Sequence, residues 1–236
     1  MKILALDSSA TVASVALCDD DRLLAEYTLN NGNTHSETIL PMIEDLLSKF
    51  NMTADDVELF AASSGPGSFT GVRIGAATLK GLAFGKNKPC AEVSTLEALA
   101  ENLRVCRGLI CPVMNARRSQ VYTALFRSDG ESLTRLMDDS AMAIKELDGI
   151  LAGYGEPIYF CGDGYSITVS ALKSTPYISV PDRLRHQSAY SVAVVAYKQF
   201  SDGRTTSDQQ FKVTYLRPSQ AERELNEKNN RKEETK

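Results

Sequence analysis

Three polar turns carry the residue types that could hold a nucleotide. The first, Asp7-Ser8-Ser9, places a carboxylate and two hydroxyls directly after the apolar run 2–6. Such a turn can direct side chains and backbone N–H groups at a phosphate or at its magnesium ion. The same residues also form ordinary hairpin turns through Asx and Ser hydrogen bonds, and composition alone favours this simpler interpretation.

The second turn, at 65–75, reads GPGSFTGVRIG and stands between a predicted strand and a predicted helix. Glycine lets the backbone approach a ligand, and a helix N-terminus favours anions. The turn has no Lys-Ser/Thr pair, and Thr70 stands where a dinucleotide motif has its third glycine. The third turn, at 161–164, could close over an adenine or simply reverse the chain. No turn is persuasive alone, and the candidate cleft residues are Asp7, Ser8, Ser9, Gly65, Gly67, Ser68, Gly162, Asp163 and Gly164.

Residues for metal binding or nucleophilic catalysis are sparse. The two histidines, His35 and His186, have no Cys or acid beside them at ligand spacing. The five cysteines lack CxxC spacing, so we interpret them as reduced thiols of a cytoplasmic protein. No G-x-S-x-G motif marks a serine nucleophile. We therefore predict no metal site, and we find no strong catalytic signature.

The composition excludes several other classes of protein. The 236 residues are 43% hydrophobic, and 26 basic against 30 acidic residues give a net charge of −4. The longest apolar stretches are far shorter than the roughly 20 residues that cross a bilayer, and the run 2–6 is too short for a secretory signal. The acidic balance argues against a main phosphate-gripping surface. We expect a cytoplasmic protein without a membrane partner.

The predicted elements fall into two similar sets of strands followed by helices. Thr34 and Glu37 fit a capping box for the first helix, and Ser94 or Thr95 can open the third. We predict an α/β protein of two α+β lobes, each with a mixed sheet, at 1–105 and 106–216, and a polar tail at 217–236 that frays. The predicted strands are 2–6, 11–17, 22–29, 57–62, 93–95, 109–114, 120–126 and 157–161, and the main helices are 34–50, 69–84, 143–151 and 188–200.

Glycine spacing in the second predicted helix needs a physical reason. Gly67, Gly71 and Gly75 fall four apart, although glycine inside a helix costs about 0.5–1 kcal/mol relative to alanine. Close approach of another backbone supplies a reason, and that backbone belongs either to this protein's own sheet or to a second chain. The apolar stripe 39/43/46/47/50 on the first helix has the same two interpretations.

The order of these pieces resembles the bacterial TsaB (YeaZ) family of the tRNA threonylcarbamoyladenosine system. The stretch at 65–75 is highly specific, and the resemblance covers about residues 1–217. The other stretches at the family's places are Ile3–Asp7 with Ser8-Ser9, His35-Ser36, Ile39-Leu40-Pro41-Met42, Val93-Ser94-Thr95-Leu96, Asn115-Ala116-Arg117, Val121-Tyr122, Gly162-Asp163-Gly164 and Tyr215-Leu216-Arg217.

The resemblance implies an actin/Hsp70/sugar-kinase (ASKHA) fold and a subunit that is not itself an enzyme. Relatives of that fold bind ATP between two lobes, whereas this family partners its catalytic paralogue, TsaD, and the ATPase TsaE. Their complex transfers threonylcarbamoyl to the adenosine beside the anticodon of tRNAs that read codons beginning with A. The resemblance further implies a homodimer when the chain is alone, tRNA contact mainly through partners, and ATP, ADP or Mg only in the assembled complex.

Departures from the catalytic paralogue agree with that expectation. Where the paralogue carries its metal-binding H-x-x-x-H, this chain has Thr95 and Leu99, which cannot replace two imidazoles. Ser9 stands at the phosphate-turn glycine of ATP-binding relatives, so the resemblance implies a vestigial nucleotide cleft. The family often has Asp-Ala-Arg where this chain has Asn115-Ala116-Arg117; asparagine keeps hydrogen bonding but loses the charge.

The family pairs through its first two helices, so the resemblance assigns the apolar stripe and the small residues to a partner interface. An interface of standard size buries about 800 Å² per side. We expect a bulky residue at Gly75 to weaken association and to spare the fold. The predicted interface residues are His35, Ile39, Met42, Ile43, Leu46, Leu47, Gly71, Val72, Gly75, Thr78, Leu79 and Leu82.

Two other functions stay open at this point. The same cleft could serve a stand-alone ATP-dependent kinase or ATPase, although Ser9 speaks against it. A peptidase is the third interpretation, because related sequences have been labelled glycoproteases, but neither metal ligands nor a nucleophile motif support it.

Overall fold

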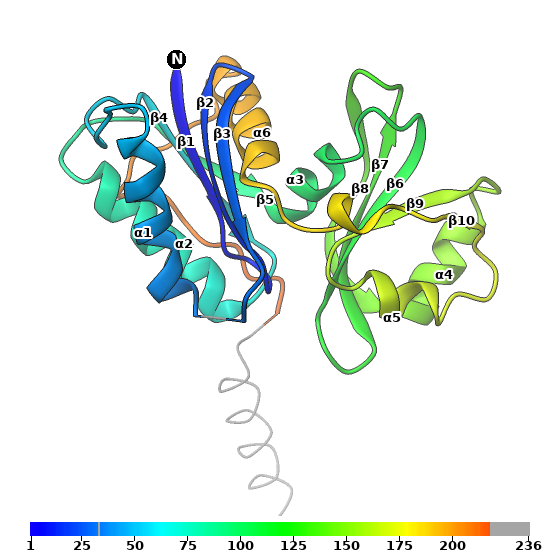
Figure 1. Ribbon diagram of the computed structural model, residues 1–236. Coiled ribbons are helices and arrows are strands. Elements are labelled where there is room, and N and C mark those ends of the chain that lie inside the picture. Colours follow the sequence, from blue (N-terminus) through cyan, green and yellow to red (C-terminus); the bar gives the residue numbers. More distant parts are fainter. Residues whose placement is uncertain (33, 218–236) are drawn as a thin grey trace, which may run out of the picture.

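The computed structural model describes residues 1–32 and 34–217. They form two lobes that lie side by side, each built on one mixed β-sheet with helices against it (Figure 1). This architecture confirms the predicted α/β class. Of the tail predicted at 217–236, residues 218–236 lie outside the described residues.

The sheet of the first lobe joins an antiparallel meander to two parallel strands. The meander confirms the three strands expected at the start of the chain, and β1 pairs with β4 in parallel from Ile3 opposite Leu59 to Leu6 opposite Ala62. The order is β3-β2-β1-β4-β5, with bounds β1 (Lys2–Asp7), β2 (Ala13–Asp19), β3 (Arg22–Leu29), β4 (Leu59–Gly65) and β5 (Cys90–Ser94).

Helices cover both faces of this sheet, and the alternation of side chains along β1 shows how. Leu4 and Leu6 belong to a core cluster beneath α1 (His35–Ser48) and α2 (Phe69–Ala83), whereas Ile3 and Ala5 face α6 (Ala189–Ser201). Successive residues of a strand point to opposite faces. A strand covered on both faces reads as a continuous apolar run, as 2–6 does.

Helix α6 corrects the assignment of residues 106–216 to a second lobe. It packs on β1, β2 and β5 of the first sheet through Val192, Ala193 and Ala196, which are fully buried there. The chain therefore leaves the first lobe after α3 (Thr95–Glu101), builds the second sheet and returns. Whether each lobe is a domain that folds by itself stays a prediction.

The second lobe repeats the strand order of the first. Its sheet runs β10-β9-β6-β7-β8, with β6 and β9 parallel. The long strand β8 was missed, because its alternation of apolar residues is interrupted by Asp138-Asp139, and acids have low strand propensity. The elements are β6 (Gly108–Asn115), β7 (Gln120–Ser128), β8 (Leu133–Ala143), α4 (Ile144–Ala152), β9 (Ile158–Cys161), α5 (Tyr165–Val169), β10 (Tyr177–Ile178) and the 3-10 turn η1 (Asp182–Leu184).

Helix starts were predicted with mixed success. Ser94 caps α3, because its hydroxyl accepts a hydrogen bond from Glu97 N at 3.2 Å. The capping box at Thr34 is wrong: Glu37 N donates to the Thr34 carbonyl oxygen at 3.0 Å, and the Thr34 side chain makes no cap. Thr34 is still the residue before the helix.

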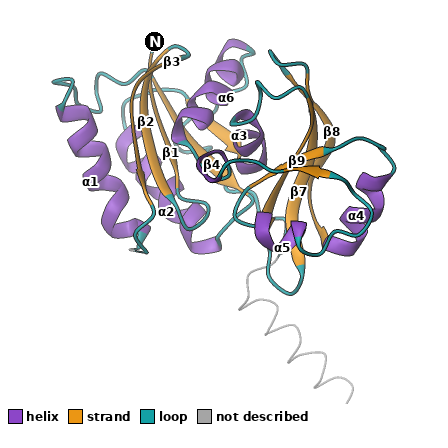
Figure 2. Cartoon of the chain, turned by 45° about the vertical axis from the view of Figure 1, so that its right-hand side comes forward, coloured by secondary structure: helices purple, strands orange, loops and turns teal. Residues whose placement is uncertain are grey.

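The lobes meet along α3, which packs on both sheets. Leu96 and Leu99 of α3 share a buried cluster with Ala10 of the first lobe and with Ile110 and Met114 of the second. Figure 2 shows α3 and α6 between the two sheets, while α1 lies on the outer side of the first. Among residues 1–32 and 34–217, no helix is long and apolar enough to cross a membrane.

Candidate functional site

The turn after β1 uses most of its polar atoms on itself. Asp7 is 1% exposed, and its Oδ1 accepts hydrogen bonds from the Ser9 amide at 2.8 Å and from the Ser9 hydroxyl at 2.6 Å. The Ser63 hydroxyl of β4 donates to the other carboxylate oxygen. Burial raises the pKa of Asp7, and the hydrogen bonds from Ser63 and Ser9 oppose that rise. Asp7 is therefore a structural acceptor at the strand end.

The glycines of 65–75 pack onto this turn. A Cβ atom on Gly71 would lie 2.0 Å from the Ser8 carbonyl oxygen, and one on Gly67 would lie 2.4 Å from the Ser9 carbonyl oxygen. Gly75 faces Ser8 Oγ at 2.6 Å in the same way. Gly67 and Gly71 are thus required by backbone oxygens of the protein's own turn after β1, and Gly75 by the side chain of Ser8 in that turn. This settles the choice between own sheet and second chain for Gly67, Gly71 and Gly75.

The start of α2 is held over the turn by direct hydrogen bonds. Ser68 N donates to the Ser9 carbonyl oxygen at 2.7 Å, and the Ser68 hydroxyl accepts from Gly71 N. The Ser8 hydroxyl donates back to the Gly71 carbonyl oxygen at 2.9 Å. These polar atoms of the turn therefore form hydrogen bonds within the lobe, so they are not available to bind a phosphate.

The second lobe closes its own strand end in the same manner. Gly162 has φ +99°, and a Cβ there would lie 2.1 Å from the Val113 carbonyl oxygen of β6. Gly164 N donates to that oxygen at 3.0 Å, and Asp163 Oδ1 accepts from Asn115 N at 3.1 Å. Burial raises the pKa of Asp163, while the Asn115 amide lowers it.

A cavity of about 600 Å³ lies between these two closed turns. It confirms that the sequence motifs meet, because Ser9, Gly67, Ser68 and Asp163 all line it. The other candidate cleft residues do not line it: Asp7, Ser8, Gly65, Gly162 and Gly164 are buried behind it. That this nucleotide cleft is vestigial stays a prediction.

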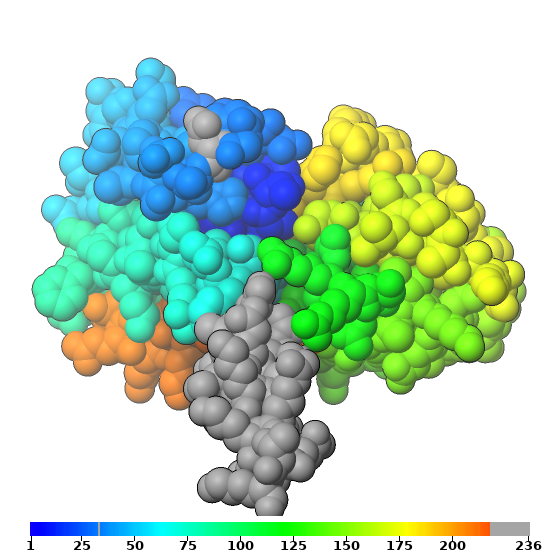
Figure 3. Space-filling view, turned by 90° about the horizontal axis from the view of Figure 1, so that it is seen from below, coloured from blue at the N-terminus to red at the C-terminus, as the bar shows by residue number. Residues whose placement is uncertain are grey.

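Sequence reasoning missed the C-terminal segment at this cavity. Tyr215 stacks on Phe69 with ring centroids 4.7 Å apart, and the Arg73 guanidinium lies 3.8 Å above the Phe69 ring. Arg217 donates from Nη1 to the Ala116 carbonyl oxygen at 3.0 Å, so the segment 215–217 joins the two lobes. Figure 3 shows the underside of the molecule, where the cyan part of the first lobe meets the green part of the second. The only sequence signal was the position of Tyr215-Leu216-Arg217 in the family pattern.

The turn between β6 and β7 differs from the turn between β1 and β2. Arg117, Arg118 and Ser119 are exposed and have φ of +63°, +52° and +56°. Non-glycine residues in this left-handed region cost of order 1–3 kcal/mol each, and such positions cluster at functional sites. Asn115 Oδ1 accepts a hydrogen bond from Arg117 N at 2.8 Å, so the asparagine side chain holds the backbone of this turn.

The predicted partner-interface residues are mostly core. Their side chains were assigned to a partner because helical stripes do not reveal which side faces the sheet. The structure corrects this by burying Ile39, Met42, Ile43, Leu46, Leu47, Val72 and Leu79 in the first lobe. Gly71 and Gly75 are buried against Ser8, so the expectation that a bulky residue at Gly75 spares the fold is wrong. Only His35, Thr78 and Leu82 of that set are partly exposed.

His35 has a structural partner as well. Its Nε2–H donates to the Ala10 carbonyl oxygen at 2.6 Å and joins the start of α1 to the β1–β2 turn. Thr95 and Leu99, which stand at the places of the paralogue's two histidines, are both buried in α3. In the described part of the chain, no group of three or more His, Cys, Asp or Glu side chains could hold a metal ion.

The two lobes have the same strand order, and in each lobe a glycine-containing loop packs on a strand end beside the shared cavity. These features define a protein of the ASKHA fold class. Two solved structures titled as YeaZ or as similar to peptidase YEAZ, both from Pseudomonas aeruginosa, share this fold. One superposes with a TM-score of 0.79 at 25% identity over 92% of this chain and 99% of that one. The other has a TM-score of 0.78 at 26% identity over 91% and 99%.

Sequence comparisons define the family. The family model described as TsaD: tRNA N6-adenosine threonylcarbamoyltransferase matches residues 22–223. The tRNA threonylcarbamoyladenosine biosynthesis protein TsaB of Bacillus subtilis is 36% identical over 71% of this chain and 73% of its own length. TsaB of Escherichia coli is 29% identical over 95% and 98%. The chain belongs to the TsaB (YeaZ) family, which confirms the resemblance drawn from the motifs.

Proposed function

We propose that this chain is a non-catalytic subunit of the machinery that makes tRNA threonylcarbamoyladenosine, and that it acts by binding the catalytic paralogue TsaD. Membership in the TsaB family carries the proposal. A tRNA N6-adenosine threonylcarbamoyltransferase of Kosmotoga olearia is also 30% identical over 84% of this chain, which supports common ancestry with the transferase. Two paralogous chains with the same fold can associate through equivalent surfaces, as two copies of one chain do in a symmetric homodimer.

The contacts at the strand end support the absence of catalysis. Asp7 is occupied by Ser9 and Ser63, so it is not free to position a magnesium ion or a water. The Ser9 carbonyl oxygen accepts Ser68 N, which leaves no open phosphate turn there. Thr95 and Leu99 are buried where the paralogue holds its metal. We propose that ATP, ADP and Mg bind only in the assembled complex, with TsaE as the ATPase.

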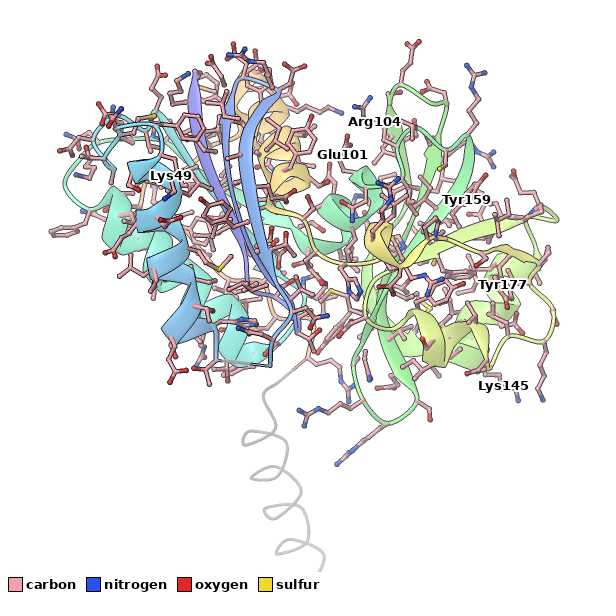
Figure 4. The ribbon with its side chains drawn as sticks, in the orientation of Figure 1. Lys49, Glu101, Arg104, Lys145, Tyr159 and Tyr177 are labelled. Carbon is pink, nitrogen blue, oxygen red and sulfur yellow. The ribbon has the colours of Figure 1, made fainter. Side chains whose placement is uncertain are left out.

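The outer face of α1 and α2 is the surface we propose for TsaD, in place of the buried stripe. Leu40 of α1 is 44% exposed, and Phe84 at the end of α2 is 75% exposed. A Cβ on Gly81 would have no atom of the described residues within 4 Å apart from its own helix backbone, so nothing in residues 1–32 and 34–217 requires a glycine there. Figure 4 marks Lys49 at the end of α1, on the side of the first lobe that faces away from the second. The same face would serve a homodimer when the chain is alone.

A matched pair of variants tests this surface. Leu40→Glu should weaken binding of purified TsaD by about tenfold or more, because a charge would be buried at the centre of the contact. Ile150→Glu on α4 is the control, since Ile150 is also a helical residue and is 41% exposed. Equal binding by both variants in titration calorimetry would refute the surface. In a reconstituted reaction, full-rate modification without this chain would refute the subunit role.

The alternative function is a stand-alone ATP-dependent kinase or ATPase. The cavity of about 600 Å³ is large enough for a small ligand, and Ser9, Ser68 and Asp163 line it. Calorimetric titration of the isolated chain with Mg-ATP distinguishes the two functions. Micromolar binding of Mg-ATP with turnover would favour the enzyme. If no heat of binding is measured even with millimolar Mg-ATP, the result would favour the subunit.

A further inference from the structure

The chain after α6 runs back along the first lobe and reaches the cavity that the two lobes share. We refer to residues 211–217 as the strap. In Figure 1 the strap lies in the orange segment that comes to the space between the lobes, below α3. The strap forms part of the wall of the cavity of about 600 Å³, because the residues that line it include Thr214, Tyr215, Leu216 and Arg217.

The beginning of the strap is anchored in the first lobe. Phe211 is 2% exposed and belongs to the core cluster beneath α1 and α2. Lys212 N donates to Glu92 Oε1 of β5 at 2.8 Å. Just before the strap, Thr206 pairs with Cys90 of β5 through two backbone hydrogen bonds of 2.8 Å. Because a buried ring and a bridge to the sheet edge hold it, this end of the strap moves with the first lobe.

The glycine motif at 65–75 makes room for the strap. Gly65 at the end of β4 has φ +116°, and a Cβ atom there would lie 2.4 Å from the Thr214 carbonyl oxygen. Thr214 N donates to the Ser64 carbonyl oxygen at 2.7 Å, so the strap and the strand end are in direct backbone contact. This close approach explains the first glycine of the motif without a ligand.

The last three residues of the strap are held by contacts at the surface. Tyr215 is 42% exposed, its ring stacks on Phe69, and its hydroxyl accepts a hydrogen bond from Arg73 Nε of α2 at 2.6 Å. Arg217 then reaches the second lobe and donates to the Ala116 carbonyl oxygen at 3.0 Å. Contacts that water can reach open at a lower free energy than contacts in a core. The strap is therefore firmly held where it begins and releasable where it ends.

Helix α3 joins the two lobes by contacts of a different kind. Leu96 is fully buried in a cluster that contains residues of both lobes. Ser94, which caps α3, donates from its hydroxyl to Asp139 Oδ2 of β8 at 2.5 Å. Glu97 forms an ion pair with Arg135 of β8, with an N–O distance of 3.1 Å. Because these contacts do not involve the strap, α3 keeps the lobes joined when the strap is released.

We propose that the strap is a latch on the shared cavity. While Arg217 is bound to the Ala116 carbonyl oxygen, the lobes stay together and the cavity keeps its volume of about 600 Å³. When Arg217 leaves that oxygen, the lobes part about α3 and the cavity widens. A molecule that contacts Tyr215 or its partners on α2 would shift the balance between the two states. This inference goes beyond the proposed function, since it concerns the isolated chain.

Tryptophan fluorescence can measure the opening, because the sequence contains no tryptophan. Tyr122→Trp places one indole in the wall of the cavity, where dissolved acrylamide quenches it more strongly as the cavity widens. In that background, Arg217→Ala should raise the quenching constant by about twofold or more, because loss of a hydrogen bond favours the open state. Arg183→Ala is the matched control and should leave the constant unchanged, since Arg183 is exposed in η1 and does not line the cavity.

Tyr215 gives a graded test of the same latch. Tyr215→Phe keeps the ring on Phe69 and loses the hydrogen bond from Arg73, whereas Tyr215→Ala loses both contacts. In the Tyr122→Trp background, the quenching constant should therefore be smallest for the unaltered strap, larger for Tyr215→Phe and largest for Tyr215→Ala.

Two results would overturn the latch. One is an equal quenching constant for Arg217→Ala and Arg183→Ala, and the other is a constant that Tyr215→Phe leaves unchanged. Tyr215→Phe removes a single oxygen atom, so it decides the question if circular dichroism shows that a larger substitution prevents folding. The proposed function is tested separately by Leu40→Glu, because Leu40 lies on α1 and does not line the cavity.

Discussion

The two lobes share a strand order, yet the turns that close their first hairpins are opposites. The β1–β2 turn is buried, and its polar atoms bond to one another and to α2. The β6–β7 turn projects from the sheet, with Arg117–Ser119 exposed and left-handed. One turn is a packing surface, and the other carries two arginines at the surface of the second lobe.

The helix that follows the fourth strand explains the difference. In the first lobe, α2 begins with glycines that let its backbone rest on Ser8 and Ser9. In the second lobe, Gly162 and Gly164 make the same approach to Val113, but they stop short of the turn and lead into the five-residue α5. The two lobes share a topology, so a few local residues at each strand end determine what that end does.

The largest effect is expected where α2 rests on the first turn. Gly71→Ala should lower the free energy of unfolding by about 3 kcal/mol, because its Cβ would lie 2.0 Å from a backbone oxygen that cannot move aside. Gly81→Ala on the same helix should raise it by about 0.5–1 kcal/mol, since among the described residues no atom beyond the helix's own backbone lies within 4 Å of a Cβ there. Urea unfolding followed by circular dichroism measures both. Similar changes for the two variants would show that α2 does not rest on the β1–β2 turn.

The next effect separates two buried carboxylates by their pH dependence. Burial raises the pKa of Asp7, so its contribution to stability is present below its unfolded pKa and is lost as pH rises through the folded value. Burial also opposes ionisation of Asp148, but hydrogen bonds from Lys173 and Thr175 outweigh it and lower the pKa. That contribution is present above the unfolded pKa and is lost as pH falls through the folded value.

Asparagine substitutions make this contrast measurable. Relative to Asp7→Asn, the unaltered chain should lose stability as pH rises from the acid range. Relative to Asp148→Asn, it should gain stability over the same rise. Urea unfolding of all three proteins across that range gives the two difference curves. Curves of the same sign would contradict the assigned environments of the two carboxylates.

Much of the fold could be predicted because its signals are local. The run 2–6, the helix starting after Thr34 and the glycine turn at 65–75 each read correctly from a few neighbouring residues. Strand β8 and the return of α6 to the first sheet could not be predicted, because an edge strand with acids has a weak pattern and packing partners are not encoded in periodicity.

The candidate site was predictable only in part for a related reason. Ser9, Gly67, Ser68 and Asp163 were found because each stands in a motif, and the cavity joins them. The burial of Ile39 and Leu46 and the approach of Gly75 to Ser8 depend on which side of a helix meets the sheet. Phe69 and Tyr215, which stack at this cavity, come from distant segments whose meeting only the tertiary structure shows.

The smallest effect compares the two turns directly. Ser119→Gly should stabilise the protein by about 0.5–1 kcal/mol, because φ of +56° is strained for serine and free for glycine. Its backbone contact to Ile144 N is retained. Thr11→Gly at the first turn should destabilise by a similar amount, because φ there is not positive and glycine only adds freedom to the unfolded chain. Thermal unfolding of the two variants should shift in opposite directions. A shift to lower temperature for Ser119→Gly would mean that the second turn is not held in the left-handed conformation.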